Sequence, residues 1–249
     1  MNSLVRVVLV RPTIAANIGA TARVMANFGQ SDLRLVAPEA DPFSEEARKL
    51  SARGEPILDG LKRHDDLAKA LADCVLTAGT SARTAGVFRS TSAGLAWEIM
   101  PRLIEAMASG PVALVFGSEP AGLTNEELVQ CHFVMHIPTS EAYPALNLAQ
   151  SVAICLYELQ RTALTRAGRS DHRTMATHEA QARMFEHLRL ALEEIHFLWG
   201  ENAESLMHAL RHLLGRAELS PIEVDLLHGL ARQILWSARQ TQPGERRGE

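Results

Sequence analysis

Residues 137–149 read Ile-Pro-Thr-Ser-Glu-Ala-Tyr-Pro-Ala-Leu-Asn-Leu-Ala, and this stretch constrains the architecture of the 249-residue chain more than any other. An apolar run ends at Ile137 and Pro138, a short loop follows, and Asn147 opens a buried helix that we expect to reach Glu158. Small residues at the start of a helix indicate close packing against a cofactor or another backbone. Ordinary helix–helix packing explains the pattern equally well.

Two further segments combine glycines with polar side chains. In the first, Asn17 and Gly19 are followed one helical turn later by Arg23, on the same helix face as Gly19. In the second, residues 116–123 read Phe-Gly-Ser-Glu-Pro-Ala-Gly-Leu, so two glycines flank the carboxylate of Glu119 in a tight turn. Read alone, each has an ordinary explanation: an Asn helix cap with a surface Arg, and a strand-to-helix turn.

Short β-rich runs separated by helical segments occupy the first part of the chain. We expect strands at 5–10, 33–36, 74–78, 112–116 and 133–137, with a weak sixth at 56–58. Because these runs are apolar on nearly both faces, they predict an α/β fold with a mostly parallel sheet covered on both sides. The segments that carry Asn17, Glu119 and Asn147 lie near the carboxyl ends of strands, the edge where such sheets bind ligands.

A polar, basic run without periodicity at 165–177 predicts a linker. It separates an α/β domain at 1–164 from a helical extension at 178–240, and a polar, flexible tail follows at 241–249.

In the extension, residues 185, 188, 192, 195 and 199 are apolar at helical spacing and predict one helix. A later helix opens at Ser220, followed by Pro221 at its first position and by Glu223 as a capping-box residue.

Composition narrows the class of protein. A formal charge of −4 and a pI of about 6.2 argue against coating nucleic acid by gross electrostatics. A nucleic-acid partner would require a local basic surface, and assembly across subunits is one way to form it. The three cysteines form no CxxC motif and read as reduced core thiols. The short N-terminal apolar run is expected to be a strand rather than a signal peptide, which favours a cytoplasmic protein.

Common ligand motifs are missing. His208 and His212 have a zinc-compatible spacing, but no HExxH pattern accompanies them, so we expect no metal. The first strand is followed by neither a GxGxxG turn nor a GxxxxGK(S/T) loop, which disfavours a generic nucleotide-binding enzyme.

Taken in order, the polar segments resemble the three motifs of the SPOUT methyltransferases. The sequence has N-x-G-x-x-x-R at 17–23, G-x-E-x-x-G-L-T at 117–124, I-P at 137–138 and L-N-L-A-x-S-V-A at 146–153. Residues 79–83, Gly-Thr-Ser-Ala-Arg, and the helical extension are similar to the TrmJ branch. The chain thus resembles a SPOUT-class RNA 2′-O-methyltransferase of the TrmH superfamily, closest to the TrmJ-type tRNA (cytidine/uridine-2′-O-)-methyltransferases.

This resemblance implies a fold, a cofactor and a partner. The family's α/β domain ends in a C-terminal trefoil knot, which pattern reasoning alone does not give. The knot binds S-adenosylmethionine, and the enzymes act as homodimers whose active site lies across the interface. The implied substrate is tRNA, methylated at the pyrimidine nucleotide that opens the anticodon loop.

The resemblance also implies roles for individual residues. The catalytic set is Arg23, Asn17, Glu119 and Asn147, where Arg23 orients and polarises the hydroxyl because a free guanidinium is a poor base. Cofactor contacts are expected at Thr80, Ser81, Ala82, Gly117, Ile137, Pro144, Ala145 and Leu146. RNA phosphate contacts are expected at Arg83, Arg89, Arg166 and Arg169, although each is also a candidate for an ordinary solvated arginine.

One position departs from the family pattern, because many members have Ser where this chain has Ala145. The missing hydroxyl is either dispensed with or supplied by a group such as Ser81 or Tyr143. Two alternative functions stay open: methylation of ribosomal RNA, and a non-catalytic RNA-binding module with the same fold. Base preference and the set of tRNAs are not readable from the sequence.

Overall fold

The computed structural model describes residues 4–82, 93–166 and 175–241. Its centre is a seven-stranded sheet in the order β3-β2-β1-β6-β4-β7-β5, in which all pairs are parallel. The strands are β1 (Val5–Val10), β2 (Asp32–Val36), β3 (Lys62–His64), β4 (Leu76–Thr80), β5 (Ala93–Leu95), β6 (Val112–Phe116) and β7 (Phe133–His136).

All five strongly predicted strands are present, with β4 shifted two residues towards the C-terminus. The weak strand at 56–58 was a wrong prediction: Pro56 lies in the first turn of α3 (Glu55–Asp59), where its missing N–H and fixed φ favour a helix. The two edge strands, β3 and β5, were not predicted because each has three residues and no apolar alternation.

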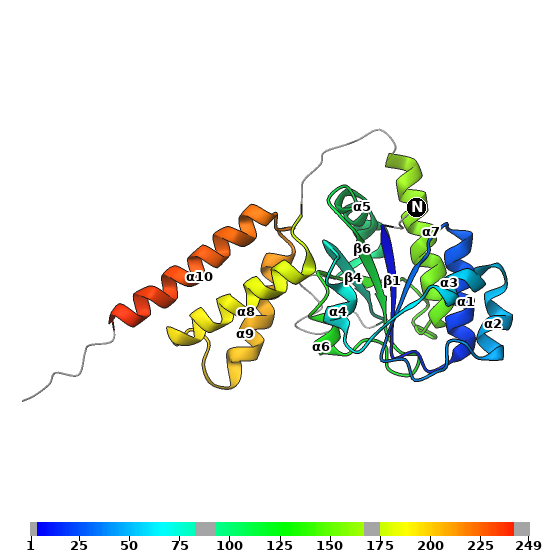
Figure 1. Cartoon of the computed structure of the whole chain (residues 1–249), viewed down its shortest axis with the longest axis horizontal. Coiled ribbons are helices and arrows are strands. Elements are labelled where there is room, and N and C mark those ends of the chain that lie inside the picture. Colours follow the sequence, from blue (N-terminus) through cyan, green and yellow to red (C-terminus); the bar gives the residue numbers. More distant parts are fainter. Residues whose placement is uncertain (1–3, 83–92, 167–174, 242–249) are drawn as a thin grey trace, which may run out of the picture.

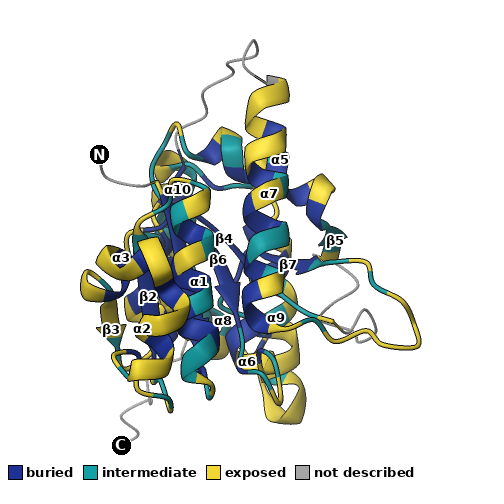
Figure 2. Cartoon of the chain, turned by 90° about the vertical axis from the view of Figure 1, so that its right-hand side faces the viewer, coloured by how far each residue is buried: buried dark blue, intermediate teal, exposed yellow. Residues whose placement is uncertain are grey.

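Helices cover both faces of the sheet. The remaining helices of the α/β body are α1 (Ala15–Asn27), α2 (Glu45–Ser51), α4 (Leu67–Leu71), α5 (Ala96–Ala106), α6 (Asn125–Leu128) and α7 (Leu148–Arg166). Alternate residues of β1 feed two apolar clusters, Val7 and Leu9 on the α1, α5 and α7 side and Val8 and Val10 on the α4 and α6 side. Figure 2 shows buried strands beneath α1 and α7, with β3 and β5 at opposite edges of the sheet.

The extension is a helical lobe beside the α/β body (Figure 1). It comprises α8 (His178–Glu194), α9 (Ala203–Gly215) and α10 (Pro221–Thr241), and α10 packs along α8. Ser220 caps α10 as predicted, and its N–H donates to the Glu223 carboxylate at 2.7 Å. The single periodic helix predicted through residue 199 ends earlier, because the chain turns at Ile195 and His196 has a φ of 57°.

Buried polar contacts join the extension to the sheet. The Nδ1 atom of His132 accepts a hydrogen bond from the Thr77 N–H at 3.2 Å, and its Nε2 lies 2.9 Å from the Gln181 Oε1 atom on α8. His178 donates its backbone N–H to the Cys74 carbonyl, and its Nε2 lies 2.9 Å from the Gln130 carbonyl. The start of α8 is therefore fixed to the turns that lead into β4 and β7.

Two further features of the structure concern membrane insertion and metal binding. In the ranges that the structure describes, no helix combines the length and apolarity that crossing a membrane requires. Over the same ranges, no group of three or more His, Cys, Asp or Glu side chains is arranged to hold a metal ion.

Candidate active site

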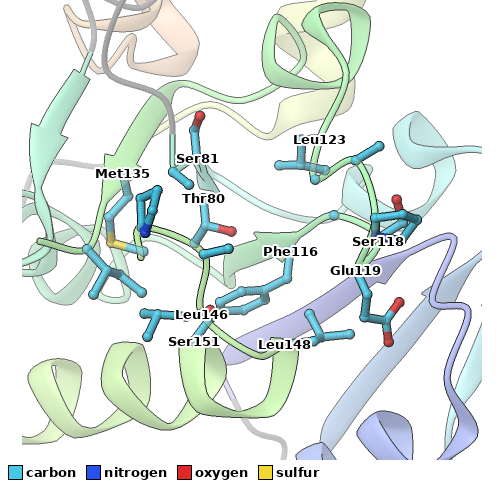
Figure 3. A pocket seen from close by; sticks show the side chains of 18 residues that line it. Thr80, Ser81, Phe116, Ser118, Glu119, Leu123, Met135, Leu146, Leu148 and Ser151 are labelled. Atoms are coloured by element: carbon cyan, nitrogen blue, oxygen red, sulfur yellow. The ribbon is translucent and has the colours of Figure 1, made fainter. Parts of the chain in front are cut away.

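A cavity of about 270 Å³ opens at the carboxyl edge of the sheet (Figure 3). Its walls come from the segments that follow β4, β6 and β7 and from the first turn of α7. All the residues predicted to contact the cofactor line it: Thr80, Ser81, Ala82, Gly117, Ile137, Pro144, Ala145 and Leu146. The structure therefore brings together side chains that lie in three separate parts of the sequence.

Further lining residues were not among those predicted. They include Phe116, Ser118, Leu123, Met135, Leu148 and Ser151. Most flank a predicted residue, so the signal was their position beside a motif; Ser151 lies one turn into α7 and lines the cavity through helix periodicity.

The wall after β6 is a tight turn. Gly122 has a φ of +69°, which favours glycine, and its N–H donates to the Ser118 carbonyl at 2.8 Å. A Cβ on Gly117 would lie 2.0 Å from the Gly122 carbonyl carbon, so only glycine permits this approach. The turn holds Glu119 between the two glycines at the opposite end of the cavity from Met135 (Figure 3).

Glu119 is held by hydrogen bonds to both carboxylate oxygens. Oε1 accepts from the Asn17 side-chain amide at 2.8 Å, and Oε2 accepts from the backbone N–H and the hydroxyl of Thr13, both at 2.9 Å. Partial burial by itself raises the pKa of this carboxyl, but the donors from Asn17 and Thr13 outweigh it and leave the pKa below its ordinary value. Glu119 is therefore ionised at neutral pH.

Asn147, directly before α7, extends this network. Its side-chain amide donates to the Asn17 Oδ1 atom at 2.8 Å, and its own Oδ1 accepts from the Ala149 N–H at 2.9 Å. As predicted, a helix begins at this point: Asn147 directly precedes α7, and its side chain caps the helix. Asn17 does not cap α1, because the N-cap is Ile14, and its side chain turns inwards to Glu119.

Thr13 is a participant that sequence reasoning did not single out. Its neighbours Arg11 and Pro12 match no ligand motif, and its partner Glu119 is far away in the sequence. The available signal was its place directly after β1, at the carboxyl edge of the sheet.

Arg23 lies apart from this network. It is exposed on α1, does not line the cavity, and forms no ion pair among the described residues. Gly19 could let another chain approach closely, but here it packs against Ala47 of α2 in the same chain, whose carbonyl oxygen would be 2.0 Å from an added Cβ. The structure of one chain thus places Asn17, Glu119 and Asn147 together and leaves Arg23 outside.

The candidate hydroxyls near Ala145 differ in position. Ser81 lines the cavity, as does Ser151, whose hydroxyl donates to the Asn147 carbonyl at 3.1 Å. Tyr143 is 79% exposed and does not line it.

The predicted RNA-contacting arginines lie at the limits of the description. Arg83, Arg89 and Arg169 fall outside the described residues, and Arg166 is the last residue of α7.

Could this cavity hold the cofactor that the sequence resemblance implies? Leu123, Met135 and Leu146 provide apolar walls suited to a purine ring, whereas Ser81 and Ser118 provide hydroxyls and loop backbone suited to a ribose. The donor set is thus compatible with an adenosyl group, and no metal-binding chemistry is needed to explain it.

Comparisons with known proteins agree with this geometry. Residues 4–157 match the SpoU rRNA Methylase family, and residues 179–245 match the C-terminal domain of the tRNA methyltransferase TrmJ. The tRNA (cytidine/uridine/adenosine-2′-O-)-methyltransferase TrmJ of Pseudomonas aeruginosa (strain UCBPP-PA14) is 36% identical, over 94% of this chain and 95% of that protein.

Solved structures show the same relationship. The crystal structure of TrmJ from Z. mobilis ZM4 superimposes with a TM-score of 0.79 at 28% identity, covering 92% of this chain and 98% of that chain. An AdoMet-bound rRNA methyltransferase from Sinorhizobium meliloti superimposes with a TM-score of 0.51 at 26% identity, covering 63% of this chain and 56% of that chain.

Proposed function

Because the chain belongs to the SpoU rRNA methylase family, and within it to the TrmJ-type tRNA methyltransferases, we propose that it transfers a methyl group from S-adenosylmethionine to a ribose 2′-hydroxyl of tRNA. The observation that carries the proposal is the Asn17–Glu119–Asn147 network at the edge of the cavity. Three polar side chains from distant segments meet there, at the ligand-binding edge of a parallel sheet.

The cavity residues hold the cofactor in this proposal. Loop backbone at Thr80, Ser81 and Ala82, and at Ile137 and after, surrounds the adenosyl group, while Gly117 lets the turn after β6 close over it. When bound, the cofactor supplies a methyl group already activated by a sulfonium charge, so no metal is required. What the protein adds is orientation of the acceptor and a route for its proton.

Glu119 acts as an anchor rather than as a proton acceptor. Both of its oxygens already accept hydrogen bonds, and its lowered pKa makes it a weak base at neutral pH. The fixed carboxylate holds Asn17, whose Oδ1 in turn holds the Asn147 amide. This network presents a rigid polar edge against which the acceptor ribose is positioned.

Arg23 is proposed to complete the site of a partner subunit. Its side chain is exposed and lies outside the cavity of its own chain, which fits a role in trans across a homodimer. There the guanidinium orients and polarises the 2′-hydroxyl and contacts the adjacent phosphate. A composite groove between two subunits, with Arg83, Arg89, Arg166 and Arg169 as phosphate contacts, lets a chain of charge −4 hold RNA.

The chain's division belongs to the same proposal. Residues 1–164 are assigned to the methyltransferase domain with its trefoil knot, 165–177 to the linker and 178–240 to the helical extension, although α7 continues to Arg166. Of the expected tail at 241–249, only Thr241, the last residue of α10, lies within the described residues. The TrmJ C-terminal match favours tRNA over ribosomal RNA as substrate, with the pyrimidine nucleotide that opens the anticodon loop as the site. The cytoplasm, where tRNA is modified, is the proposed location.

Methyl transfer to tRNA tests this function directly. Labelled S-adenosylmethionine is incubated with the full chain and bulk tRNA that lacks the modification, and the product is digested to nucleosides. A 2′-O-methylpyrimidine in the anticodon loop supports the proposal. Label in ribosomal RNA alone points to the ribosomal alternative, and cofactor binding without transfer to any RNA points to the non-catalytic module.

A further inference from the structure

Arg11 has a constrained backbone two residues before Thr13, which binds the Glu119 carboxylate. It is the first residue after β1 and has a φ of 49°, a left-handed conformation that non-glycine residues seldom adopt. Its N–H donates to the Val36 carbonyl at 2.8 Å, and the Pro12 carbonyl accepts from the Glu39 N–H at 3.1 Å and the Ala40 N–H at 3.0 Å. These hydrogen bonds to other segments of the same chain hold the loop in place, as a strained backbone conformation requires.

The Arg11 side chain forms a two-point ion pair with Glu127. Nη2 lies 3.1 Å from Oε2, and Nη1 contacts Oε1. This fork geometry fixes orientation as well as attraction, because two parallel contacts define a plane. Glu127 is 9% exposed, so its charge is shielded from water and depends on this guanidinium.

Glu127 also closes the turn that carries Glu119. Its carboxylate accepts from the Thr124 N–H at 2.8 Å, and the Thr124 hydroxyl accepts from the Glu127 N–H at 3.3 Å, which is a capping box at the start of α6. The segment from Gly117 to Glu127 is thus held at one end by the tight glycine turn and at the other by this box.

Two links therefore join the loop after β1 to the loop after β6. One is the pair of hydrogen bonds from Thr13 to Glu119, and the other is the Arg11–Glu127 ion pair. Residues 11 and 13 lie two positions apart, so a displacement at one moves the other. If the ion pair is broken, the distance between the two loops is no longer fixed. The hydrogen bonds from Thr13 to the Glu119 carboxylate then lose their geometry.

We propose that Arg11 is a positioning residue for methyl transfer, because its ion pair with Glu127 sets the spacing at which Thr13 and Asn17 hold Glu119. Arg11 touches no reacting group in this scheme; it acts through Glu127 and the turn. This inference rests on the proposed methyltransferase function.

Steady-state kinetics of methyl transfer to tRNA test the proposal. Arg11→Gln is expected to lower kcat about 10-fold while changing the KM for tRNA less than about 2-fold, because misplacement by about 1 Å at a catalytic site reduces the rate rather than substrate binding. Arg11→Lys, which keeps the charge but not the fork, is expected to recover part of the loss. Arg48→Gln is the matched control, since Arg48 is likewise an ion-paired arginine, but its partners Glu55 and Asp59 belong to α3 and not to the segment that carries Glu119.

A double-mutant comparison separates a positioning role of Arg11 from a simple loss of stability. In Thr13→Val the hydroxyl bond to Glu119 is gone while the backbone N–H bond remains, so Arg11→Gln should lower kcat there by a smaller factor than in wild type. Losses that multiply instead, or an Arg11→Gln variant no slower than Arg48→Gln once the folded fraction is corrected for by thermal unfolding, overturn the proposal.

A readout without methyl transfer keeps this inference distinct from the function on which it rests. The carboxyl resonance of Glu119, assigned in ¹³C-glutamate-labelled protein by Glu119→Gln, is titrated in wild type and in Arg11→Lys. The pKa of Glu119 should rise towards its ordinary value in Arg11→Lys and stay unchanged in Arg48→Gln. An unchanged pKa in Arg11→Lys contradicts the positioning role, whereas a wild type inactive on every RNA contradicts only the proposed function.

Discussion

Arg23 and the Asn17–Glu119–Asn147 network occupy different places in the structure. The network is satisfied within one chain, with 2.8 Å hydrogen bonds on both sides of Asn17, so it is already formed before any ligand arrives. Arg23 has no ion pair in the described part of the chain and is exposed. This separation fits the proposal that the network is pre-organised in one chain and that Arg23 is supplied by a partner subunit.

Replacing Arg23 tests that division. Arg23→Ala should lower the rate of single-turnover transfer by at least about 100-fold, because a group that orients and polarises the nucleophile contributes roughly that much. Cofactor affinity by calorimetry and the oligomeric state by light scattering should stay close to wild type, since the side chain neither lines the cavity nor supports the core. Arg183→Ala on α8 is the exposed-arginine control; near-normal turnover in Arg23→Ala would remove this residue from catalysis.

Asn17→Asp tests the donor to Glu119. The substitution keeps an acceptor for Asn147 but places a second carboxylate 2.8 Å from Glu119, so the two share a proton and the pKa of the pair rises. Transfer should fall by about 100-fold at pH 8 and partly recover towards pH 5.5, as protonation restores a donor between the two groups. In wild type the lowered pKa of Glu119 keeps it ionised over this range and gives no such recovery.

A pH–rate profile of single-turnover transfer measures this effect. Asn27→Asp, at the exposed end of α1, adds the same charge away from the network and should match wild type. If Asn17→Asp and wild type have parallel profiles, Asn17 does not hold Glu119 during the reaction.

The buried strands are predicted well from the sequence. The strand cores at β1, β2, β4, β6 and β7 follow from apolar runs whose burial any parallel sheet requires. The edge strands β3 and β5 do not, because three residues such as Lys62–His64 form a strand only when a neighbour supplies the hydrogen bonds. Asn17 shows the same limit: local pattern suggests a helix cap, and only Glu119, distant in sequence, draws its side chain inwards.

The candidate site divides in the same way. Motif resemblance finds the residues of the cavity wall, since they follow directly on recognisable strands. Thr13 and Arg11 escape it because their roles arise from contacts with Glu119 and Glu127, which depend on how β1 and β6 pair in register. Contacts between residues more than 100 positions apart leave no local pattern in a single sequence.

The tight turn after β6 leaves no room for a side chain at Gly117. Gly117→Ala forces a methyl group to within 2.0 Å of the Gly122 backbone, so the turn must open. We expect a loss of affinity for S-adenosylmethionine of at least about 10-fold and destabilisation of roughly 1–3 kcal/mol, as for other overpacked sites. Gly229→Ala on α10 is the matched control: nothing lies within 4 Å of an added Cβ, and replacing a helical glycine by alanine stabilises a protein by about 0.5–1 kcal/mol.

Calorimetry with the cofactor and thermal unfolding measure both variants. Wild-type cofactor affinity in Gly117→Ala would show that this turn does not shape the binding site.

For the whole molecule, the joint between body and extension depends on neutral histidines. His132 accepts from the Thr77 N–H through Nδ1, so its proton is on Nε2 and points at Gln181. A second proton would place two donors face to face at Thr77. Burial, with a contribution from His178, lowers the pKa of His132 to about 4, and burial also lowers the pKa values of His178, His208 and His212, which lie in the same region.

Joint stability should consequently depend on pH in a defined window. A histidine whose pKa is lower in the folded state than its unfolded value of about 6.5 takes up protons on unfolding, so stability is complete above pH 6.5 and falls as the pH drops towards 4. His132 alone accounts for a loss of up to roughly 3 kcal/mol, from a difference of about 2.5 pKa units. Carboxylates with lowered pKa values, such as Asp32 and Asp73, contribute their loss at lower pH, below their unfolded pKa of about 4.

Urea unfolding between pH 4.5 and 7.5 measures this dependence. Trp199 and Trp236 both lie in the extension and report on its release through fluorescence, while Trp97 on α5 reports on the body. In His132→Gln the titrating group is gone, so the slope of stability against pH should be shallower than in wild type, whereas His196→Gln, at an exposed histidine, should leave the slope unchanged. An equal slope in wild type and His132→Gln would mean that other groups govern the joint. A shallower slope would instead tie the docking of the extension to the protonation of one residue, which directly precedes β7, the strand whose Met135 lines the cavity.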